Sequence, residues 1–221
     1  MMTKPQLIIF DLDGTLMNTL GDITACLNAA LSECGYPTHD SAIEFINNGA
    51  RRLIADALPP DVRTDETIDN VLAVYRDYYS ACTNDLTFPY EGTVEMVHKL
   101  KKAKLKLALF SNKDHEHVMR LMNRDFPGLF DCIVGISPDV LPKPNPGGID
   151  KILFSTQCQK NKTLYVGDSR VDILTARNAG LTMYGVNWGF KGNEPFISDP
   201  QLPTVDTPAQ LTKRILHLCN E

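Results

Sequence analysis

The chain has 221 residues, of which 43% are hydrophobic and 22% charged, and its formal net charge is −5. This length suits one large domain or a core with a smaller insertion, and such a core needs no disulfides. The acidic balance and the lack of a long basic run argue against a nucleic-acid partner. No cysteine pair has zinc-binding spacing, no apolar run approaches the length of a membrane span, and the N-terminus resembles no signal peptide. We therefore expect a soluble, cytoplasmic protein with no membrane partner.

The first predicted strand is the apolar run 7–10, and the carboxylates of Asp11 and Asp13 follow it directly. Residues i and i+2 of a strand share a face, so both carboxylates leave the strand side by side. Gly14 then permits a turn that most residues resist. The alternative is a purely structural role, in which the two aspartates only cap or turn the end of the strand. Their position after a buried strand favours a site for a hard cation and for acid–base or nucleophilic chemistry.

Residues 18–86 show helical periodicity and no strand pattern. Apolar side chains recur at helical spacing over 19–34 and 67–81. Ser41–Glu44 has the spacing of a capping box, which predicts a helix start before Phe45. We interpret 18–86 as an inserted, all-helical cap domain, and 1–17 with 87–221 as the core domain.

From residue 88 onward, strand and helix patterns alternate. Strands are predicted at 105–110, 132–136, 163–166 and 181–186, and helices at 93–102, 114–123, 147–158, 171–178 and 207–218. Strands that alternate with single helices indicate a parallel sheet with right-handed crossovers. The predicted fold is therefore α/β, with a Rossmann-like parallel sheet core.

Ligands of such sheets bind at the carboxyl ends of the strands, and polar clusters follow the predicted strands of this chain. The clusters are Asp11 with Asp13, Ser111-Asn112-Lys113, Lys143 within the proline-rich loop 141–146, and Asp168 with Asp172. Three of these clusters also have a purely structural interpretation. Ser111, Asn112 or Asp168 could cap a helix, and Lys143 could lie in a solvated surface loop. Together they predict one pocket in which acidic and basic side chains from distant segments meet.

Carboxylates, a fixed ammonium and a hydroxyl–amide pair suit phosphoryl transfer with a magnesium ion. The sequence has no G-x-G-x-x-G, no nucleotide-binding P-loop and no G-x-S-x-G nucleophile motif. These absences argue against hydride transfer, a P-loop nucleotide site and a serine hydrolase.

The four motifs Asp11–Thr15, Ser111–Lys113, Lys143-Pro144 and Gly167–Asp172 resemble those of the haloacid dehalogenase-like superfamily. The helical block after the first motif resembles the small cap domain of that superfamily. Within it, Asn47–Leu53 and Phe88–Gly92 are most similar to the phosphoglycolate phosphatase group.

The resemblance implies a role for each motif residue. Asp11 would attack phosphorus and form an aspartyl-phosphate, while Asp13 would protonate the leaving oxygen and later activate water. The Asp11 carboxylate, the Asp13 main-chain carbonyl and Asp168 would hold Mg²⁺, with Asp172 behind them. The phosphate would contact Ser111, the Asn112 amide nitrogen and Lys143.

The expected function is a magnesium-dependent phosphatase acting on a small phosphorylated metabolite, with phosphoglycolate favoured. Alternatives are a phosphosugar mutase, an inorganic pyrophosphatase or a non-catalytic binding protein on the same scaffold. A dehalogenase is disfavoured because Asp13 and Lys143-Pro144 suit phosphate and metal. The sequence does not predict an oligomeric state.

We also consider three further features of the sequence. Residues 18–88 hold eleven Asp and Glu against four Arg, so the adjacent Arg51 and Arg52 after Gly49 stand out. One hypothesis is that at least one of them binds an anionic leaving group of the substrate, such as a carboxylate. The alternative is that both are solvated and pair with Asp56 or Glu44. His115 and His117 are expected on a solvated helix face, and Asn187–Phe190 as a packing or partner surface.

Overall fold

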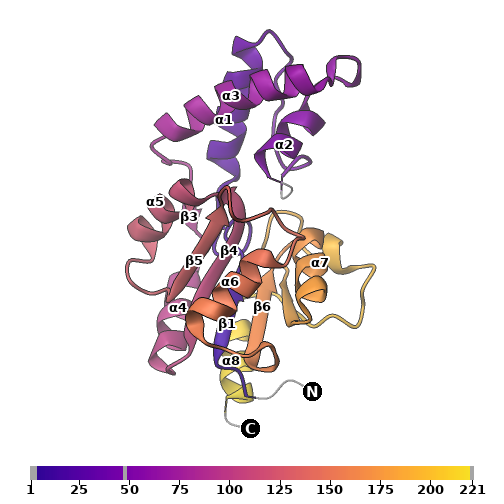
Figure 1. Ribbon diagram of the computed structural model, residues 1–221. Helices are drawn as coiled ribbons and strands as arrows, with labels where there is room; N and C mark the ends of the chain where they lie inside the picture. Colours follow the sequence, from indigo (N-terminus) through magenta and orange to yellow (C-terminus); the bar gives the residue numbers. More distant parts are fainter. Residues whose placement is uncertain (1–3, 47–48, 220–221) are drawn as a thin grey trace. The chain divides into compact units, whose positions relative to one another are not determined.

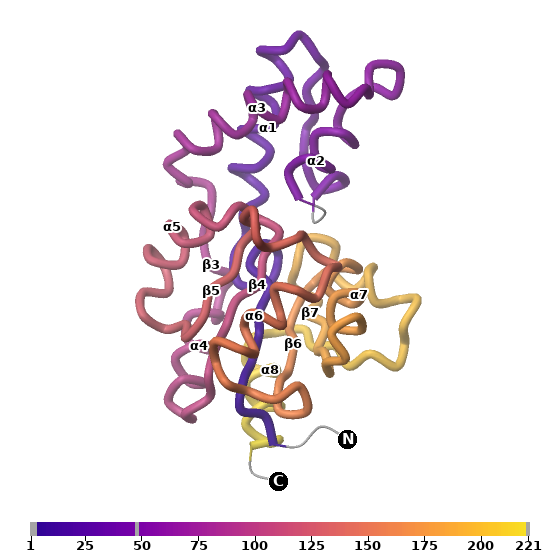
Figure 2. Tube along the Cα trace, in the orientation of Figure 1, coloured from indigo at the N-terminus to yellow at the C-terminus, as the bar shows by residue number. Residues whose placement is uncertain are grey.

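The computed structural model describes residues 4–46 and 49–219, and it divides into two compact units. We call Met1–Met17 with Pro89–Glu221 the sheet unit, and Asn18–Phe88 the helical unit. Figures 1 and 2 trace the chain through both units. The two chain connections, β2 (Met17–Asn18) and β3 (Phe88–Pro89), pair with each other as a two-stranded sheet. Within the described ranges, no helix has both the length and the apolar character of a membrane span.

The sheet unit is built on a six-stranded sheet in the order β5-β4-β1-β6-β7-β8, in which neighbouring strands pair in parallel. The strands are β1 (Leu7–Phe10), β4 (Lys106–Asp114), β5 (Cys132–Ile136), β6 (Thr163–Gly167), β7 (Thr182–Val186) and β8 (Thr204–Val205). The five predicted strands are confirmed. The two-residue strand β8 was not predicted, because so short a strand leaves no alternation to detect.

Both faces of the sheet are covered, as a parallel sheet requires. Ile8 and Phe10 of β1 face one hydrophobic core, while Leu7 and Ile9 face the other. The first core is closed by α4 (Thr93–Lys102), α5 (His115–Asp125) and α8 (Pro208–Leu218). The second is closed by α6 (Gly147–Thr156) and α7 (Arg170–Ala179), and Figure 1 shows α6 in front of the strands.

The helical unit consists of α1 (Leu20–Glu33), α2 (Ala50–Ala57) and α3 (Asp65–Ala81), with a short 3-10 turn at Pro60–Val62. Helix α3 packs against both α1 and α2. Its apolar residues recur at helical spacing, and the Thr64 hydroxyl caps its start by accepting from the Thr67 N–H. The predicted fold class, an α/β parallel sheet with an inserted helical block, is confirmed.

The helix start predicted at Ser41–Glu44 is wrong. Residues 42–45 form a turn closed by the Phe45 N–H and the Ala42 carbonyl at 2.9 Å. The Ser41 hydroxyl accepts from the nearby Ile43 N–H at 3.2 Å. Such a local bond competes with helix formation, so the capping-box spacing is not used. Helix α2 begins only at Ala50.

The contact between α6 and the sheet gives a test of the packing. A Cβ added at Gly148 would overlap the ring of Phe110. Alanine favours a helix over glycine by about 1 kcal/mol, whereas overpacking a core costs about 1–3 kcal/mol. We expect Gly148→Ala to lower the free energy of unfolding by about 1 kcal/mol in urea denaturation, a net loss because the steric cost exceeds the helix gain.

The neighbouring variant Gly147→Ala is the matched control, since its Cβ would approach only the Asn145 side-chain oxygen, at 3.0 Å. A Gly148→Ala protein more stable than the wild type would contradict the close contact between α6 and β4.

Candidate active site

Strands β1 and β6 end nearly level with each other, and β4 continues beside them to Asp114. Phe10 pairs in register with Leu109 on one side and with Val166 on the other, and the Asp11 N–H donates to the Val166 carbonyl at 2.9 Å. The residues that follow β1 and β6 and the last residues of β4 therefore meet at one edge of the sheet. The predicted convergence of distant segments is confirmed.

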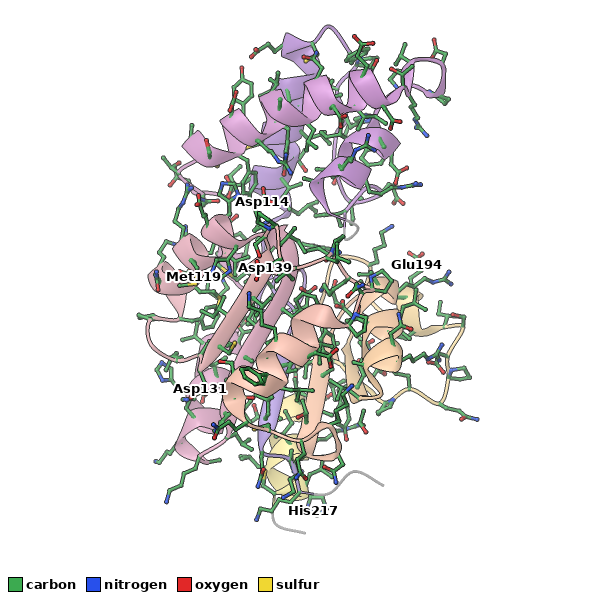
Figure 3. All side chains as sticks on the ribbon, in the orientation of Figure 1. Asp114, Met119, Asp131, Asp139, Glu194 and His217 are labelled. Carbon is green, nitrogen blue, oxygen red and sulfur yellow. The ribbon has the colours of Figure 1, made fainter. Side chains whose placement is uncertain are left out.

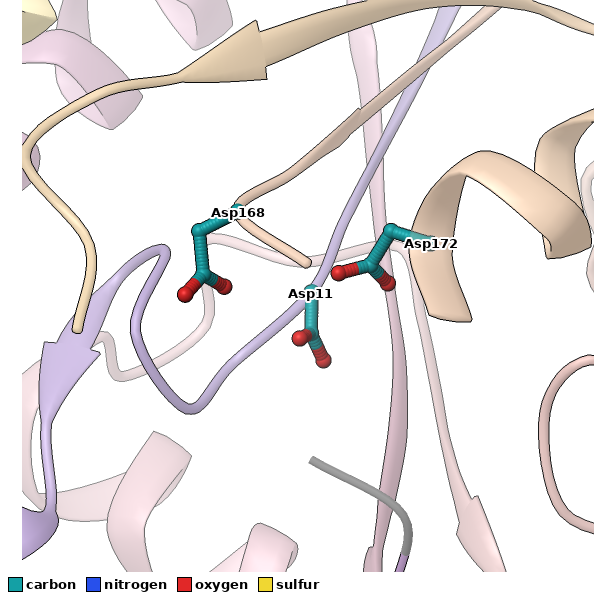
Figure 4. Close-up of side chains that lie close together, drawn as sticks. All are labelled: Asp11, Asp168 and Asp172. Carbon is teal, nitrogen blue, oxygen red and sulfur yellow. The ribbon is translucent and has the colours of Figure 1, made fainter. Parts of the chain in front are cut away.

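Three carboxylates form a buried acidic cluster at this edge. Asp11, Asp168 and Asp172 each offer an oxygen, and these oxygens lie within 4.8 Å of one another. Figure 4 shows the three side chains converging from β1, the end of β6 and the start of α7. Burial raises the pKa of Asp168 well above its ordinary value, and the charges of Asp172 and Asp11 add to the rise. Ionising all three groups at once is therefore unfavourable unless cations lie beside them.

Lys143 supplies one such cation. Its Nζ lies 2.8 Å from an oxygen of Asp11 and 2.8 Å from an oxygen of Asp172, and its side chain is 1% exposed. Burial lowers the pKa of Lys143, but the charges of Asp11 and Asp172 together outweigh that effect and raise it. The ammonium is therefore held charged inside the cluster.

The backbone of Lys143 is held by Asn112. The side-chain oxygen of Asn112 accepts from the Lys143 N–H at 2.6 Å, and its nitrogen donates to the Lys143 carbonyl at 3.3 Å. The side-chain amide of Asn112 thus positions the lysine loop. Ser111 is buried beside it, and its hydroxyl accepts from the Lys113 N–H at 3.2 Å.

Asp172 is fully engaged within the protein. One of its oxygens accepts from Lys143 Nζ and from the Tyr165 hydroxyl, each at 2.8 Å. The other accepts from the Ser169 N–H and hydroxyl, at 3.1 and 2.5 Å, in the capping box that starts α7. A carboxylate offers about four acceptor positions, so Asp172 has no capacity left for a further ligand.

Asp168 differs from Asp172 in this respect. Its Oδ1 accepts from the Thr15 hydroxyl at 3.0 Å, whereas its buried Oδ2 has no hydrogen-bond donor within the described ranges. A Cβ added at Gly14, which has φ +85°, or at Gly189 would overlap this carboxylate. A buried, unsatisfied carboxylate oxygen next to Asp11 is a typical ligand for a hard divalent cation. The residues present therefore fit such an ion.

Asp13 pairs with a second lysine. Lys113 Nζ lies 3.0 Å from Oδ1 and 3.1 Å from Oδ2 of Asp13, and the two side chains are 8% and 17% exposed. The sequence analysis named Lys113 only as a member of the Ser111–Lys113 cluster. No spacing in the sequence indicated that Lys113 pairs with Asp13.

Three other residues at this edge were missed or left open by the sequence analysis. Tyr165 lies in the middle of the apolar strand β6, where no local pattern indicates a polar role. Trp188 donates from Nε1 to the Thr15 carbonyl at 2.9 Å, and Gly189 abuts Asp168. Trp188 and Gly189 therefore pack against the first motif and Asp168, in line with the packing alternative. Both residues follow the end of β7, so the strand-end rule applied to that strand would have found them.

In the helical unit, the two candidate arginines form ion pairs with carboxylates of the same unit. Arg51 contacts Asp65 at 2.7 Å and Asp69 at 3.2 Å, and Arg52 contacts Asp56 at 2.7 Å. The pair between Arg52 and Asp56 is one that the sequence analysis gave as the alternative to substrate binding. Gly49 precedes α2 with φ +81°, whereas Asn47 and Asn48 lie outside the described residues.

The expectation of a solvated histidine face is wrong. Strand β4 ends at Asp114, labelled in Figure 3, and α5 begins at the next residue. His115 Nδ1 accepts from the Gly135 N–H at 3.2 Å, which ties its ring to β5. His117 is half-buried, and burial lowers its pKa. Both rings pack against the protein, because α5 lies on the sheet.

A doubly covered parallel sheet with buried carboxylates and a buried ammonium at its carboxyl edge defines an α/β enzyme suited to phosphoryl chemistry. The family model described as haloacid dehalogenase-like hydrolase matches residues 8–186, and the chain belongs to this family. The predicted family resemblance is confirmed, and the protein is an enzyme of the phosphoric monoester hydrolase type.

Curated relatives and solved structures are similar over nearly the whole chain. Phosphoglycolate phosphatase of Vibrio vulnificus is 31% identical over 96% of both chains. Phosphoglycolate phosphatase 1 of Pseudomonas aeruginosa is 31% identical over 91% of this chain and 76% of its own. A candidate phosphoglycolate phosphatase from Lactobacillus delbrueckii subsp. bulgaricus superposes with a TM-score of 0.87 at 30% identity, covering 96% of this chain and 99% of its own.

The acidic cluster predicts how stability depends on pH when no divalent cation is present. Burial raises the pKa of Asp11 from 3.8 to about 7, and the charge of Asp172 adds to the rise. The raised pKa means that the folded state holds the Asp11 proton more tightly than the unfolded chain does. The resulting stabilisation is complete at pH values below the ordinary pKa of Asp11, and it is lost as the pH rises through about 7. In a chelating buffer we expect Asp11→Asn to melt at a higher temperature than the wild type near pH 8, with a smaller difference near pH 5.

The control for this measurement is Asp150→Asn, which removes an exposed carboxylate paired with Lys160. It should show no such pH-dependent difference. The difference in melting temperature between Asp11→Asn and wild type should therefore depend on pH. An equal difference at both pH values would contradict charge repulsion between Asp11 and the other buried carboxylates.

The hydroxyl of Tyr165 gives a second prediction. Its removal in Tyr165→Phe keeps the ring but takes one donor from the buried Asp172. Because such a carboxylate is left undersatisfied, we expect the free energy of unfolding to fall by about 1–3 kcal/mol in urea denaturation. Tyr184→Phe, on the adjacent strand β7, is the matched control and should change stability by less than about 0.5 kcal/mol. Equal effects in both variants would exclude a special role for the Tyr165 hydroxyl.

Proposed function

We propose that this protein is a magnesium-dependent phosphatase that hydrolyses a small phosphomonoester through an aspartyl-phosphate on Asp11. The observation that carries the proposal is the pairing of buried Asp11 with Lys143, beside the unsatisfied oxygen of Asp168. A nucleophile, a cation and an open cation ligand thus lie together at the carboxyl edge of the sheet.

Asp11 and Asp13 divide the chemistry between them in this proposal. A carboxylate oxygen of Asp11 attacks phosphorus, and the bond from phosphorus to the leaving oxygen breaks. Asp13, in its protonated form at this step, passes its proton to that oxygen. Asp13 then takes a proton from water, and the resulting hydroxide attacks phosphorus. This second attack releases inorganic phosphate and restores the Asp11 carboxylate.

The remaining residues bind and balance charge. Lys143 keeps an ammonium against Asp11, where it offsets the negative charge that the phosphoryl group brings. Ser111 and the Asn112 amide nitrogen are the proposed donors to phosphate oxygens. The Asp11 carboxylate, the Asp13 main-chain carbonyl and Asp168 would hold Mg²⁺, which when bound neutralises charge on the transferring group. Asp172 supports this set by fixing Lys143.

Phosphoglycolate is the proposed substrate. The names of the curated relatives, at about 30% identity over almost the whole chain, support this choice. Gly49, Arg51 and Arg52 remain the candidates for substrate selection from the helical unit. Because both arginines already pair with carboxylates of that unit, they would have to exchange partners to contact a substrate.

The proposal is tested by phosphate release from phosphoglycolate, a hexose phosphate and pyrophosphate, with Mg²⁺ and with a chelator. We expect Mg²⁺-dependent release, greatest from phosphoglycolate. Asp11→Asn should lower kcat by at least about a thousandfold, because the nucleophile is lost. Asp150→Asn is the control and should retain wild-type activity.

Two results would contradict the proposal. Release by Asp11→Asn within tenfold of wild type would exclude Asp11 as the nucleophile. Phosphate transfer between sugars without net release of inorganic phosphate would identify a mutase instead.

A further inference from the structure

We propose that Lys113 binds the negatively charged leaving group of the substrate, and so makes the sheet unit itself selective for acidic phosphomonoesters. This inference rests on the proposed function and assigns a residue that the proposed chemistry does not use. Lys113 is the second lysine of the site, and its side chain is only 8% exposed.

The ammonium of Lys113 lies on the side of the site where the leaving group must be. A general acid acts within about 3 Å of the oxygen that it protonates. Lys113 Nζ lies 3.0 and 3.1 Å from the two oxygens of Asp13. The ammonium therefore comes within about 6 Å of the leaving oxygen when Asp13 is in place to protonate it.

An acidic leaving group carries its charge within this reach. In phosphoglycolate the carboxylate carbon is two bonds from the leaving oxygen, which is about 2.5 Å. Its oxygens extend further still, so a cation within about 6 Å of the leaving oxygen lies within their reach. An ammonium has three donors on a flexible stem, so it can contact a substrate carboxylate while it stays near Asp13.

The position of Lys113 is well defined, as a specificity residue requires. It lies in the last part of β4, two residues after Ser111, where the pairing of β4 with β5 shifts register between Phe110 and Asp114. The Lys113 N–H donates to the Ser111 hydroxyl at 3.2 Å, which fixes the backbone between them. One short segment thus presents a proposed phosphate donor and a cation for the other end of the substrate.

The arginines of the helical unit are less suited to this task. The side chains of Arg51 and Arg52 are 49% and 64% exposed, and both pair with carboxylates of their own unit. Exposed cations are screened by water and salt, whereas the largely buried Lys113 is screened much less. The geometry therefore favours Lys113 over Arg51 and Arg52 as the main residue that binds the charged leaving group.

The test compares three esters that differ in the charge of the leaving group: phosphoglycolate, 2-hydroxyethyl phosphate and phosphoethanolamine. The measured quantity is the ratio of kcat/KM for phosphoglycolate to kcat/KM for 2-hydroxyethyl phosphate. We expect Lys113→Met to lower this ratio at least tenfold, mainly through KM for phosphoglycolate. Lys113→Glu should shift preference toward phosphoethanolamine, and Lys113→Arg should keep most of the wild-type ratio.

The ratio distinguishes recognition from a merely structural role. Any effect that Lys113 has through Asp13, or through the folded fraction of a preparation, changes both esters alike and cancels. The exposed Lys151→Met serves as the control, and it should leave the ratio within about threefold of wild type.

Specific outcomes would overturn the proposal. Equal losses on both esters in Lys113→Met would mean that the lysine acts only on Asp13. A wild type that hydrolyses both esters without preference would exclude charge reading while leaving the phosphatase function intact. A wild type that releases phosphate from none of the three would instead contradict the proposed function itself.

Discussion

The site depends on one interaction, the ammonium of Lys143 held between Asp11 and Asp172. Three buried carboxylates within 4.8 Å of one another repel strongly, because little water is present to screen them. Lys143, with contacts of 2.8 Å to two of the three, offsets part of this repulsion. Loss of the ammonium would leave both buried carboxylates without their shared cation, so Asp11 and Asp172 depend on Lys143.

The partners of Lys143 are themselves fixed by ordinary elements of the fold. Asp172 belongs to the capping box that starts α7 and also accepts from Tyr165 in β6. Asn112, at the end of β4, holds the backbone of the lysine loop. The ammonium is thus positioned by two strands and a helix start, which explains how one lysine in a loop stays in a defined place.

The same packing leaves an asymmetry among the carboxylates. Asp172 has its acceptor positions filled by protein donors, whereas Asp168 keeps one buried oxygen without a donor among the described residues. Gly14 and Gly189 leave room for the Asp168 side chain, since a Cβ at either position would overlap it. The two aspartates are therefore prepared for different tasks, one to support Lys143 and the other to meet a ligand.

The sequence by itself determined the strands of the sheet, except β8, and the places of Asp11 and Asp168 directly after β1 and β6. Ser111 was expected after its strand, but β4 continues past it to Asp114. Apolar runs and helical periodicity are local signals, and a parallel sheet brings its carboxyl ends to one edge. Tertiary structure decided the partners: Lys113 with Asp13, Tyr165 with Asp172, and Arg51 with Asp65. It also decided that residues 42–45 form a turn, where the Ala42 N–H donates to the Thr24 hydroxyl of α1. These outcomes depend on which side chains meet across distant segments, and no local spacing in one chain encodes that.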